Sequence, residues 1–354
     1  MRAIVLRHTG DPENLKLETV PDPVPGPNEV VIKLHAAALN HRDVWIRKGQ
    51  YAGIKLPVIL GSDGAGHVAA AGAGVDPGWL KQEVIINPSL DWGDNKHVQS
   101  ASFRILGLPD DGTYAEFVKV PVDNIHPKPS GWSAAEAAAL PLAGLTAYRA
   151  MVTRAQVRDG ETVLVTGIGG GVSQMAMQIA LALGARVFVT SGDDAKIDRA
   201  KSLGAAGGVN YHDHSWPKTI QSLTDGIDAA IDSTGGETMN QIIQVLKPGG
   251  RVVTYGATTG PTPALEITRV FWKQISVLGS TMGTPEEFAE MLELYTNTGM
   301  RPIVDRTYPL EKAAKAHRRM ESAGQFGKIV LEITPMEPPH EAGGLLGITE
   351  SDDH

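Results

Sequence analysis

The chain has 354 residues, a formal net charge of −8 and no cysteine. The absence of cysteine excludes disulfides, thiolate catalysis and any cysteine-ligated metal site. The acidic charge argues against a nucleic-acid or anionic-membrane partner. The sequence has no apolar leader at its start and no run of 18 or more apolar residues, so we expect a cytoplasmic protein without a membrane span. A chain of this length favours two domains.

The first part of the chain, residues 1–126, is predicted to form short strands separated by Pro-rich and Gly-rich turns. The strand candidates are "AIVL", "EVVIKLHAAAL", "GHVAAAGAGV" and "YAEFVKVP". Their alternating or β-branched apolar residues indicate an irregular, largely antiparallel β domain. The Ala-rich segment 132–152 follows, and it predicts a helix with Ser133 as its N-cap.

Strands and helices then alternate. The strand candidates are "TVLVT", "RVFVT", "AAID", "RVVTYG" and "ISVLGS". This order indicates βαβ units and a doubly wound parallel sheet, so the predicted fold class is α/β with a second, irregular β domain. "TPEEFAEMLELY" predicts a further helix with Thr284 at the N-cap and Pro285 at the first position. "GKIVLEI" predicts the last strand, and the tail 336–354 is expected to be disordered.

The segment "TVLVTGIGGGVSQMAMQIALALGA" places a glycine-rich turn between a buried strand and an amphipathic helix. Glycines in this position let a pyrophosphate approach backbone N–H groups at a helix N-terminus, so the turn predicts a dinucleotide site. The residues expected to bind the dinucleotide are Gly169, Gly170, Gly171 and Val172. Ser173 stands where many such loops have their last glycine, and a small serine is expected to be tolerated there or to donate to phosphate.

The end of the second strand predicts which dinucleotide binds. An acidic residue about 20 positions after the glycines would accept from the ribose 2′-OH of NAD, but residues 189–191 are Val, Thr and Ser. Asp193 and Asp194 come later and are interpreted as residues of a helix N-terminus. Lys196 is available for a 2′-phosphate, so the sequence favours NADP(H).

Several motifs occur together in a fixed order: "LPLAGLTAYRAM", "VLVTGIGGGVSQMAMQIALALGA", "IDSTGG", "LKPGGRVVTYG" and "GKIVL". Over residues 1–333 the chain resembles the medium-chain dehydrogenase/reductases, and "GIGGGVS" resembles the glycine loop of their zinc-free, quinone oxidoreductase-like branch. The resemblance implies a GroES-like catalytic domain and a Rossmann cofactor domain. The first is predicted over residues 1–126 and 283–335, and the second over 127–282.

Comparison with the zinc-dependent members of that family predicts that both zinc sites are lost. The positions of their catalytic Cys and their His-Glu pair carry Asn40, Ser62 and Asp63, and the segment of the third ligand offers only residues 140–142, Leu-Pro-Leu. A catalytic zinc needs three N, S or O ligands and an open position. The segment resembling the structural zinc lobe retains only His97, so no zinc is expected. The remaining candidates His35, His41 and His67 are interpreted as hydrogen-bonded structural residues.

Without a metal, a substrate with its own electron sink is favoured. Hydride addition to a quinone or an α,β-unsaturated carbonyl gives a delocalised oxyanion that needs only orientation and hydrogen-bond donors. By resemblance, Asn40, Tyr51 and Thr146 lie near the nicotinamide and the substrate, with Asn40 and Tyr51 as donors. Asp43 belongs to the same candidate catalytic set and is expected, like Asp63, to order the loop.

The resemblance also implies contacts at the two ends of the cofactor and a partner. Tyr211 is expected near the adenosine 2′-phosphate, beside Ser191 and Lys196, and Gly256 in "YGATTG" near the nicotinamide amide. The strand near "KQISVLGS" is expected to pair across a two-fold axis, so the protein is predicted to be a homodimer.

Two alternatives remain open at the level of sequence. One is an alcohol or aldehyde dehydrogenase of the same family, in which Asp63 and its neighbours take over the zinc site. The other is a nucleotide-binding structural or regulatory protein with little turnover. Bound zinc would favour the first alternative, and NADPH binding without oxidation by any acceptor would favour the second.

Overall fold

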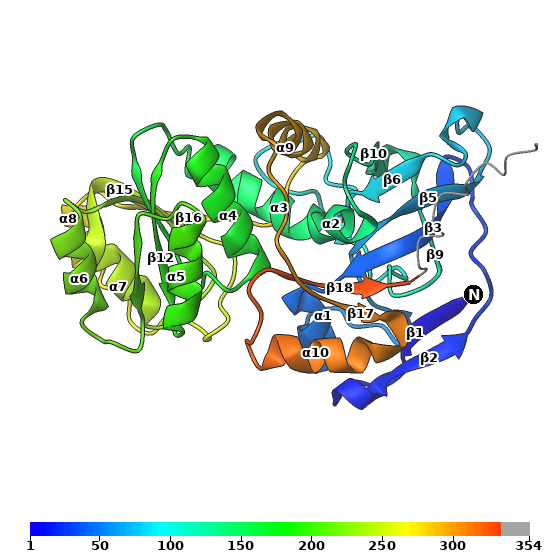
Figure 1. The fold of residues 1–354 in the computed structure, drawn as a ribbon, viewed down its shortest axis with the longest axis horizontal. Coiled ribbons are helices and arrows are strands. Elements are labelled where there is room, and N and C mark those ends of the chain that lie inside the picture. Colours follow the sequence, from blue (N-terminus) through cyan, green and yellow to red (C-terminus); the bar gives the residue numbers. More distant parts are fainter. Residues whose placement is uncertain (334–354) are drawn as a thin grey trace, which may run out of the picture.

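Two sheets of different kinds dominate the computed structural model, which describes residues 1–333 (Figure 1). A mainly antiparallel sheet lies on the right of Figure 1, together with the N-terminus, and a parallel sheet lies on the left. Helices α3 (Pro141–Tyr148) and α9 (Pro285–Thr298) lie between them. No helix among the described residues is long and apolar enough to cross a bilayer. The tail 336–354, predicted to be disordered, lies outside the described residues.

The antiparallel domain is built on a seven-stranded sheet with the order β10-β6-β5-β3-β18-β17, to which β9 adds by pairing with β3. Its strands are β3 (Glu29–Ala38), β5 (Asp63–Ala71), β6 (Glu83–Ile86), β9 (Phe117–Pro121), β10 (Ile125–Pro127), β17 (Val304–Pro309) and β18 (Lys328–Glu332). Within this sheet only β17 and β18 pair in parallel. The strands predicted from the first part of the chain are confirmed.

Smaller elements complete this domain. A three-stranded sheet has the order β2-β1-β4, and β7 pairs with β8. The bounds are β1 (Arg2–Leu6), β2 (Leu15–Thr19), β4 (Val58–Ile59), β7 (Ser89–Leu90), β8 (Arg104–Ile105), α1 (His41–Arg47) and α10 (Ala313–Glu321). α10 lies beside α1 and β18, which closes one side of the domain (Figure 1).

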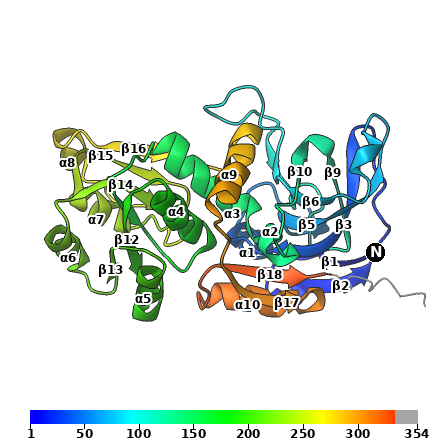
Figure 2. The ribbon, with the colours of Figure 1, turned by 45° about the horizontal axis from the view of Figure 1, so that its top comes forward.

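The parallel sheet has six strands in the order β13-β12-β11-β14-β15-β16, and every pair is parallel. The strands are β11 (Thr162–Val165), β12 (Arg186–Ser191), β13 (Gly207–Asn210), β14 (Ile227–Asp232), β15 (Leu246–Thr254) and β16 (Ser276–Gly279). The helices are α4 (Gly171–Ala182), α5 (Asp194–Ser202), α6 (Trp216–Leu223), α7 (Thr238–Val245) and α8 (Ile267–Trp272). Helices flank the sheet (Figure 2), and β11 is buried along its whole length, as expected for a parallel strand covered on both faces. The predicted doubly wound sheet is confirmed.

The segment 132–152, predicted as one helix, is wrong in its continuity. It forms α2 (Ala134–Ala139), then α3, then a π-helix over Arg149–Arg154. The break falls at Pro141, which has no N–H to donate and therefore suits the first position of a new helix. Ser133 caps α2 as predicted, by accepting from the N–H of Glu136.

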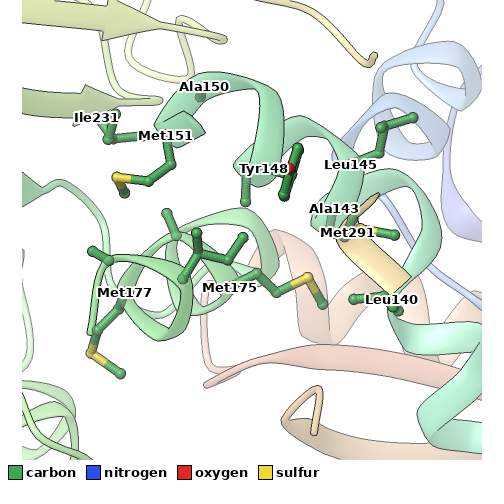
Figure 3. Close-up of a cluster of buried hydrophobic side chains, with 14 of the residues drawn as sticks. Leu140, Ala143, Leu145, Tyr148, Ala150, Met151, Met175, Met177, Ile231 and Met291 are labelled. Atoms are coloured by element: carbon green, nitrogen blue, oxygen red, sulfur yellow. The ribbon is translucent and has the colours of Figure 1, made fainter. Parts of the chain in front are cut away.

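The two domains share a core. Leu145 and Tyr148 from α3, Met175 from α4 and Met291 from α9 belong to one cluster of buried side chains (Figure 3). The cluster fixes the start of α4, and with it the glycine turn, against the chain that links the domains. α2, which the predicted division assigns to the cofactor domain, packs on β3 and β5.

The chain returns to the first sheet after β16. α9 begins at the predicted N-cap, where Thr284 accepts from the N–H of Glu287 and Pro285 takes the first position. β18 then pairs with β3, with Val330 opposite Ala38. Just before β18, the Gly327 N–H donates to the carbonyl of Gly169 in the glycine turn (3.1 Å). The last strand therefore touches both domains.

Candidate active site

The glycine turn leaves a helix N-terminus open toward a cavity. Gly167 adopts a left-handed conformation with φ 63°, and Gly170 is the N-cap of α4 without any side-chain cap. The first N–H groups of a helix have no intrahelical partner. Residues 170–173 line a pocket of about 340 Å³ between the two domains. These features fit a pyrophosphate at the predicted position.

The three glycines differ in what their missing side chains permit. A Cβ at Gly170 would meet nothing nearer than 3.5 Å, so its absence leaves space for a ligand rather than for the protein. A Cβ at Gly171 would lie 2.6 Å from Cδ of Lys328, and one at Gly169 would lie 3.0 Å from both the carbonyl of Gln325 and Nζ of Lys196. At Gly169 and Gly171, therefore, other residues of the protein occupy the space that a side chain would need.

Ser173 replaces a glycine without blocking the turn. Its side chain is buried, and its hydroxyl donates to the carbonyl of Thr166 at the end of β11 (2.7 Å). Its oxygen also lies 3.2 Å from the hydroxyl of Tyr255, and burial raises the pKa of Tyr255 to about 12. The serine therefore ties the helix to the strand instead of offering its hydroxyl to phosphate.

The end of β12 carries the residues predicted for the adenosine end. Ser191 is buried, and its hydroxyl accepts from the N–H of Asp193. Asp193 caps α5 by accepting from the N–H of Ala195, as predicted. Tyr211 and His212 lie beside this strand end, because a Cβ on Gly192 would meet both at 2.7 Å. No carboxylate ends the strand itself.

Lys196 is already engaged across the domain boundary. Its Nζ donates to the carbonyl of Ala323 (2.6 Å), and burial lowers its pKa. An ammonium has three N–H donors, so two remain for another acceptor. Ser191, Lys196 and Tyr211 are not among the residues that line the pocket.

The pocket brings together several residues predicted from distant parts of the sequence. Asn40, Tyr51, Thr146 and Gly256 all line it, in addition to the glycine turn. Thr146 donates its hydroxyl to the carbonyl of Leu142. Gly256 follows β15, directly after Tyr255. Asp43 does not line the pocket, although it lies in the first turn of α1, the helix that Asn40 caps.

Asp43 holds the backbone of Asn40 in place at the start of α1. Its Oδ2 accepts from the backbone N–H of Asn40 and from the hydroxyl of Tyr114, both at 2.9 Å. Burial raises the pKa of this carboxyl group. The contacts match the ordering function expected for Asp43.

Tyr51 stands at the exposed side of the pocket. Its side chain is 36% exposed, and the guanidinium of Arg42 lies 5.3 Å from its ring centre. Among residues 1–333 its hydroxyl has no hydrogen-bond partner, so it is free to donate to a ligand. Arg42 donates in turn to the hydroxyl of Ser62 and to the carbonyl of Leu106. Ser62 itself donates to Leu106, so both of its hydrogen-bonding functions are used.

A lysine that the sequence reading did not single out occupies the centre of the site. Nζ of Lys328 donates to the carbonyl of Leu39 (2.8 Å), to Oδ1 of Asn40 (2.7 Å) and to Oδ2 of Asp63 (2.9 Å). Lys328 is 3% exposed and Asp63 is fully buried. Asp63 also accepts from the Asn40 amide (2.9 Å) and from the N–H of Leu142 (2.8 Å). The available signal was a lysine that opens an apolar strand in "GKIVL", since a buried lysine requires a partner.

The histidines that the structure describes are not gathered into a metal site. His35 and His67 face one another with their ring nitrogens 3.0 Å apart, and burial lowers the pKa of both. Within residues 1–333 no group of three or more His, Cys, Asp or Glu residues could hold a metal ion.

Family models match both halves of the chain. The model for the alcohol dehydrogenase GroES-like domain matches residues 26–130, and the model for zinc-binding dehydrogenase matches residues 171–297. The structure agrees with these matches, since it combines an irregular β domain, a parallel sheet and a pocket between them. The chain belongs to the medium-chain dehydrogenase/reductase family, whose members use a nicotinamide cofactor.

Relatives with different names resemble the chain over nearly its whole length. The zinc-type alcohol dehydrogenase-like protein YogA of Leptosphaeria maculans is 35% identical, over 90% of this chain and 94% of its own length. The quinone oxidoreductase of Mus musculus is 33% identical, over 94% of this chain and 97% of its own. A crystal structure of an NAD-dependent alcohol dehydrogenase is 42% identical with a TM-score of 0.90, over 94% of this chain and 100% of the other.

The glycine turn gives a direct test of cofactor binding. Gly170→Val should place methyl groups in the space where a pyrophosphate approaches the helix N-terminus, and weaken dinucleotide binding about 10–100-fold, equal to about one charge-assisted hydrogen bond. Nicotinamide fluorescence titration measures this. Ala69→Val, at an exposed position of β5 outside the pocket lining, is the matched control. Unchanged affinity in a folded Gly170→Val variant would contradict the assignment.

Proposed function

We propose that this protein is a reductase that uses NADPH and no zinc to reduce quinones or α,β-unsaturated carbonyl compounds. The observation that carries the proposal is the ammonium of Lys328, held by Asn40 and Asp63 where the zinc-dependent members have metal ligands. The positive charge of this buried ammonium would repel a zinc ion bound at the same place.

The residues present do not fit a catalytic zinc. The carbonyl oxygen of the Asn40 amide already accepts from Lys328. The hydroxyl of Ser62 accepts from Arg42 and donates to the carbonyl of Leu106. Asp63 has both oxygens engaged by N–H donors. No step of the proposed reaction is therefore assigned to a metal.

The remaining groups suit a substrate that delocalises its own charge. When bound, the nicotinamide supplies the hydride. The free hydroxyl of Tyr51 and the amide of Asn40 are donors for the oxygen on which negative charge develops. Trp45, Ile105 and Leu142 line the same pocket and supply apolar surface for a conjugated substrate. The similarity to the mouse quinone oxidoreductase supports this substrate class.

An alcohol dehydrogenase is the second candidate. It is favoured by the 42% identity with the structure named NAD-dependent alcohol dehydrogenase and by the name of the fungal relative. The two candidates differ in two measurable properties, metal content and choice of cofactor.

NADPH should bind more tightly than NADH. β12 ends without an acid to accept from a ribose 2′-OH, and Lys196 retains two free N–H donors nearby. Lys196→Ala should weaken NADPH binding about 10–100-fold, as expected for loss of a charge-assisted contact, and leave NADH nearly unchanged. Fluorescence titration with both nucleotides checks this. An equal loss for both would mean that Lys196 acts only through its bond to Ala323, and tighter NADH binding would refute the NADP preference.

Activity should survive exhaustive chelation, and Tyr51→Phe should impair it. The expected loss in kcat is about 10²–10³, as for other oxyanion donors, with NADPH affinity unchanged because Tyr51 lies on the substrate side. The assay follows NADPH absorbance with a panel of quinones, enones and aldehydes, alongside metal analysis of the protein. Restoration of a chelated, inactive protein by zinc would overturn the metal-free mechanism. A harmless Tyr51→Phe would remove only the donor assignment.

We also propose that the protein forms a homodimer across β16, the edge of the parallel sheet. Nearby α8 exposes Ile267, Phe271 and Trp272, the last by 82%. An unpaired edge beside exposed apolar side chains is suited to cover by a second copy. Cytoplasmic location stays a prediction from the sequence.

Light scattering after size exclusion should give twice the chain mass. A Phe271→Asp/Trp272→Asp variant should give the single-chain mass, because two carboxylates would be buried in the interface. Leu203→Asp, at an exposed position on the end of α5, is the control. A single-chain mass for the unchanged protein would refute the dimer.

A further inference from the structure

The buried ammonium of Lys328 has a consequence for the groups that face the substrate. We propose that Lys328 is a positioning residue that turns an N–H of the Asn40 amide toward the pocket. The proposal rests on the proposed function, because it concerns the donor that a substrate oxygen would meet.

The charge of Lys328 determines which way the amide of Asn40 lies. An ammonium donates and never accepts, so the amide atom 2.7 Å from Nζ must be the carbonyl oxygen. The amide nitrogen is then on the other side, where it donates one hydrogen to Oδ2 of Asp63. An amide nitrogen has two hydrogens. Since Asn40 lines the pocket, its second N–H is available to a ligand there.

Lys328 acts through Asn40 and does not itself serve as a donor to the substrate. Its three N–H groups are used by Leu39, Asn40 and Asp63. The carboxylate of Asp63 holds the amide nitrogen from the other side, so the lysine and the aspartate fix the orientation together. A neutral side chain at position 328 removes the donor that holds the carbonyl oxygen, so the amide is then held at its nitrogen alone and its position in the pocket is less well defined. The ion pair with Asp63 thereby selects the productive orientation.

Lys328 contacts both the amide of Asn40 and the glycine turn. Its aliphatic chain packs where a Cβ of Gly171 would be, and the preceding Gly327 donates its N–H to Gly169. The glycine turn and the Asn40 amide are therefore held by consecutive residues of one segment. Small displacements at such a junction alter reaction geometry, and a misplacement of about 1 Å costs about 10²-fold in rate.

A double-mutant cycle tests whether Lys328 acts through Asn40. Wild type, Lys328→Met, Asn40→Ala and the double variant are compared in kcat and KM with NADPH and menadione, and in NADPH affinity. We expect Lys328→Met to lower kcat about 10–100-fold in the wild-type background. In the Asn40→Ala background its effect should shrink to less than about 3-fold, because the two side chains act as one unit.

Two further variants separate positioning from folding. Lys328→Met leaves Asp63 buried without its cation, so Lys328→Met/Asp63→Asn removes both charges and should recover thermal stability. Its kcat should stay low, because an amide at position 63 can pair with either end of the Asn40 amide and no longer selects one orientation. Lys315→Met, on the exposed side of α10, should behave like wild type.

The outcomes distinguish this inference from the proposed function. A wild-type protein that reduces none of the quinones or enones refutes the proposed function and this inference with it. An active wild type with additive effects of Lys328→Met and Asn40→Ala refutes the positioning alone. Recovery of kcat together with stability in Lys328→Met/Asp63→Asn also refutes it. So does a Lys328→Met variant that loses NADPH affinity but keeps its kcat at saturation, since Lys328 would then be a phosphate-binding residue.

Discussion

The pairing of β18 with β3 is the constraint on which the site depends. It joins residues from opposite ends of the chain, and it brings Nζ of Lys328 to Asn40, 288 positions away. A buried ammonium is tolerated only with an anion and full hydrogen bonding. Asp63 supplies the anion from β5, which pairs with the other edge of β3. Losing β5 or β18 would leave one of the two buried charges without its partner, and β3 lies between them and pairs with both.

The same segment determines how the two domains meet. β18 begins directly after Gly327, whose N–H is bound by the glycine turn of the parallel-sheet domain. The apolar cluster around Met175 and Met291 holds α4 against α3 on the other side of that turn. The two domains are thus joined beside the pocket by a hydrogen bond on one side and by packed apolar side chains on the other. This arrangement favours a fixed relation between the cofactor turn and the substrate side of the pocket.

The ion pair also explains the kind of chemistry that the site suits. A metal would present an uncompensated positive charge to a substrate oxygen. Lys328 and Asp63 compensate one another, and Asn40 and Tyr51 offer neutral donors at the pocket, which the guanidinium of Arg42 also lines. Neutral donors stabilise a developing oxyanion less than a metal does, which is why the proposed function assigns to this site a substrate with its own electron sink.

Local patterns predicted much of the fold and one half of the site. The alternation of strands and helices gave the parallel sheet, and the caps at Ser133 and Thr284 were correct, because these signals depend on neighbouring residues. The helical character expected over 132–152 is present, but the segment is divided because Pro141 begins a new helix. Lys328 was seen only as part of a strand motif.

The sequence by itself determined the family, the two kinds of sheet, the cofactor turn and the absence of thiolate ligands, since each follows from residue types at short spacing. Only the tertiary structure decided that Lys328 lies against Asn40 and Asp63. It also decided that Ser173 binds Thr166, that Lys196 binds Ala323 and that Asp43, outside the pocket, holds Asn40 at the start of α1. Those outcomes depend on contacts between distant segments, and a polar side chain takes whichever partner folding brings within hydrogen-bond reach.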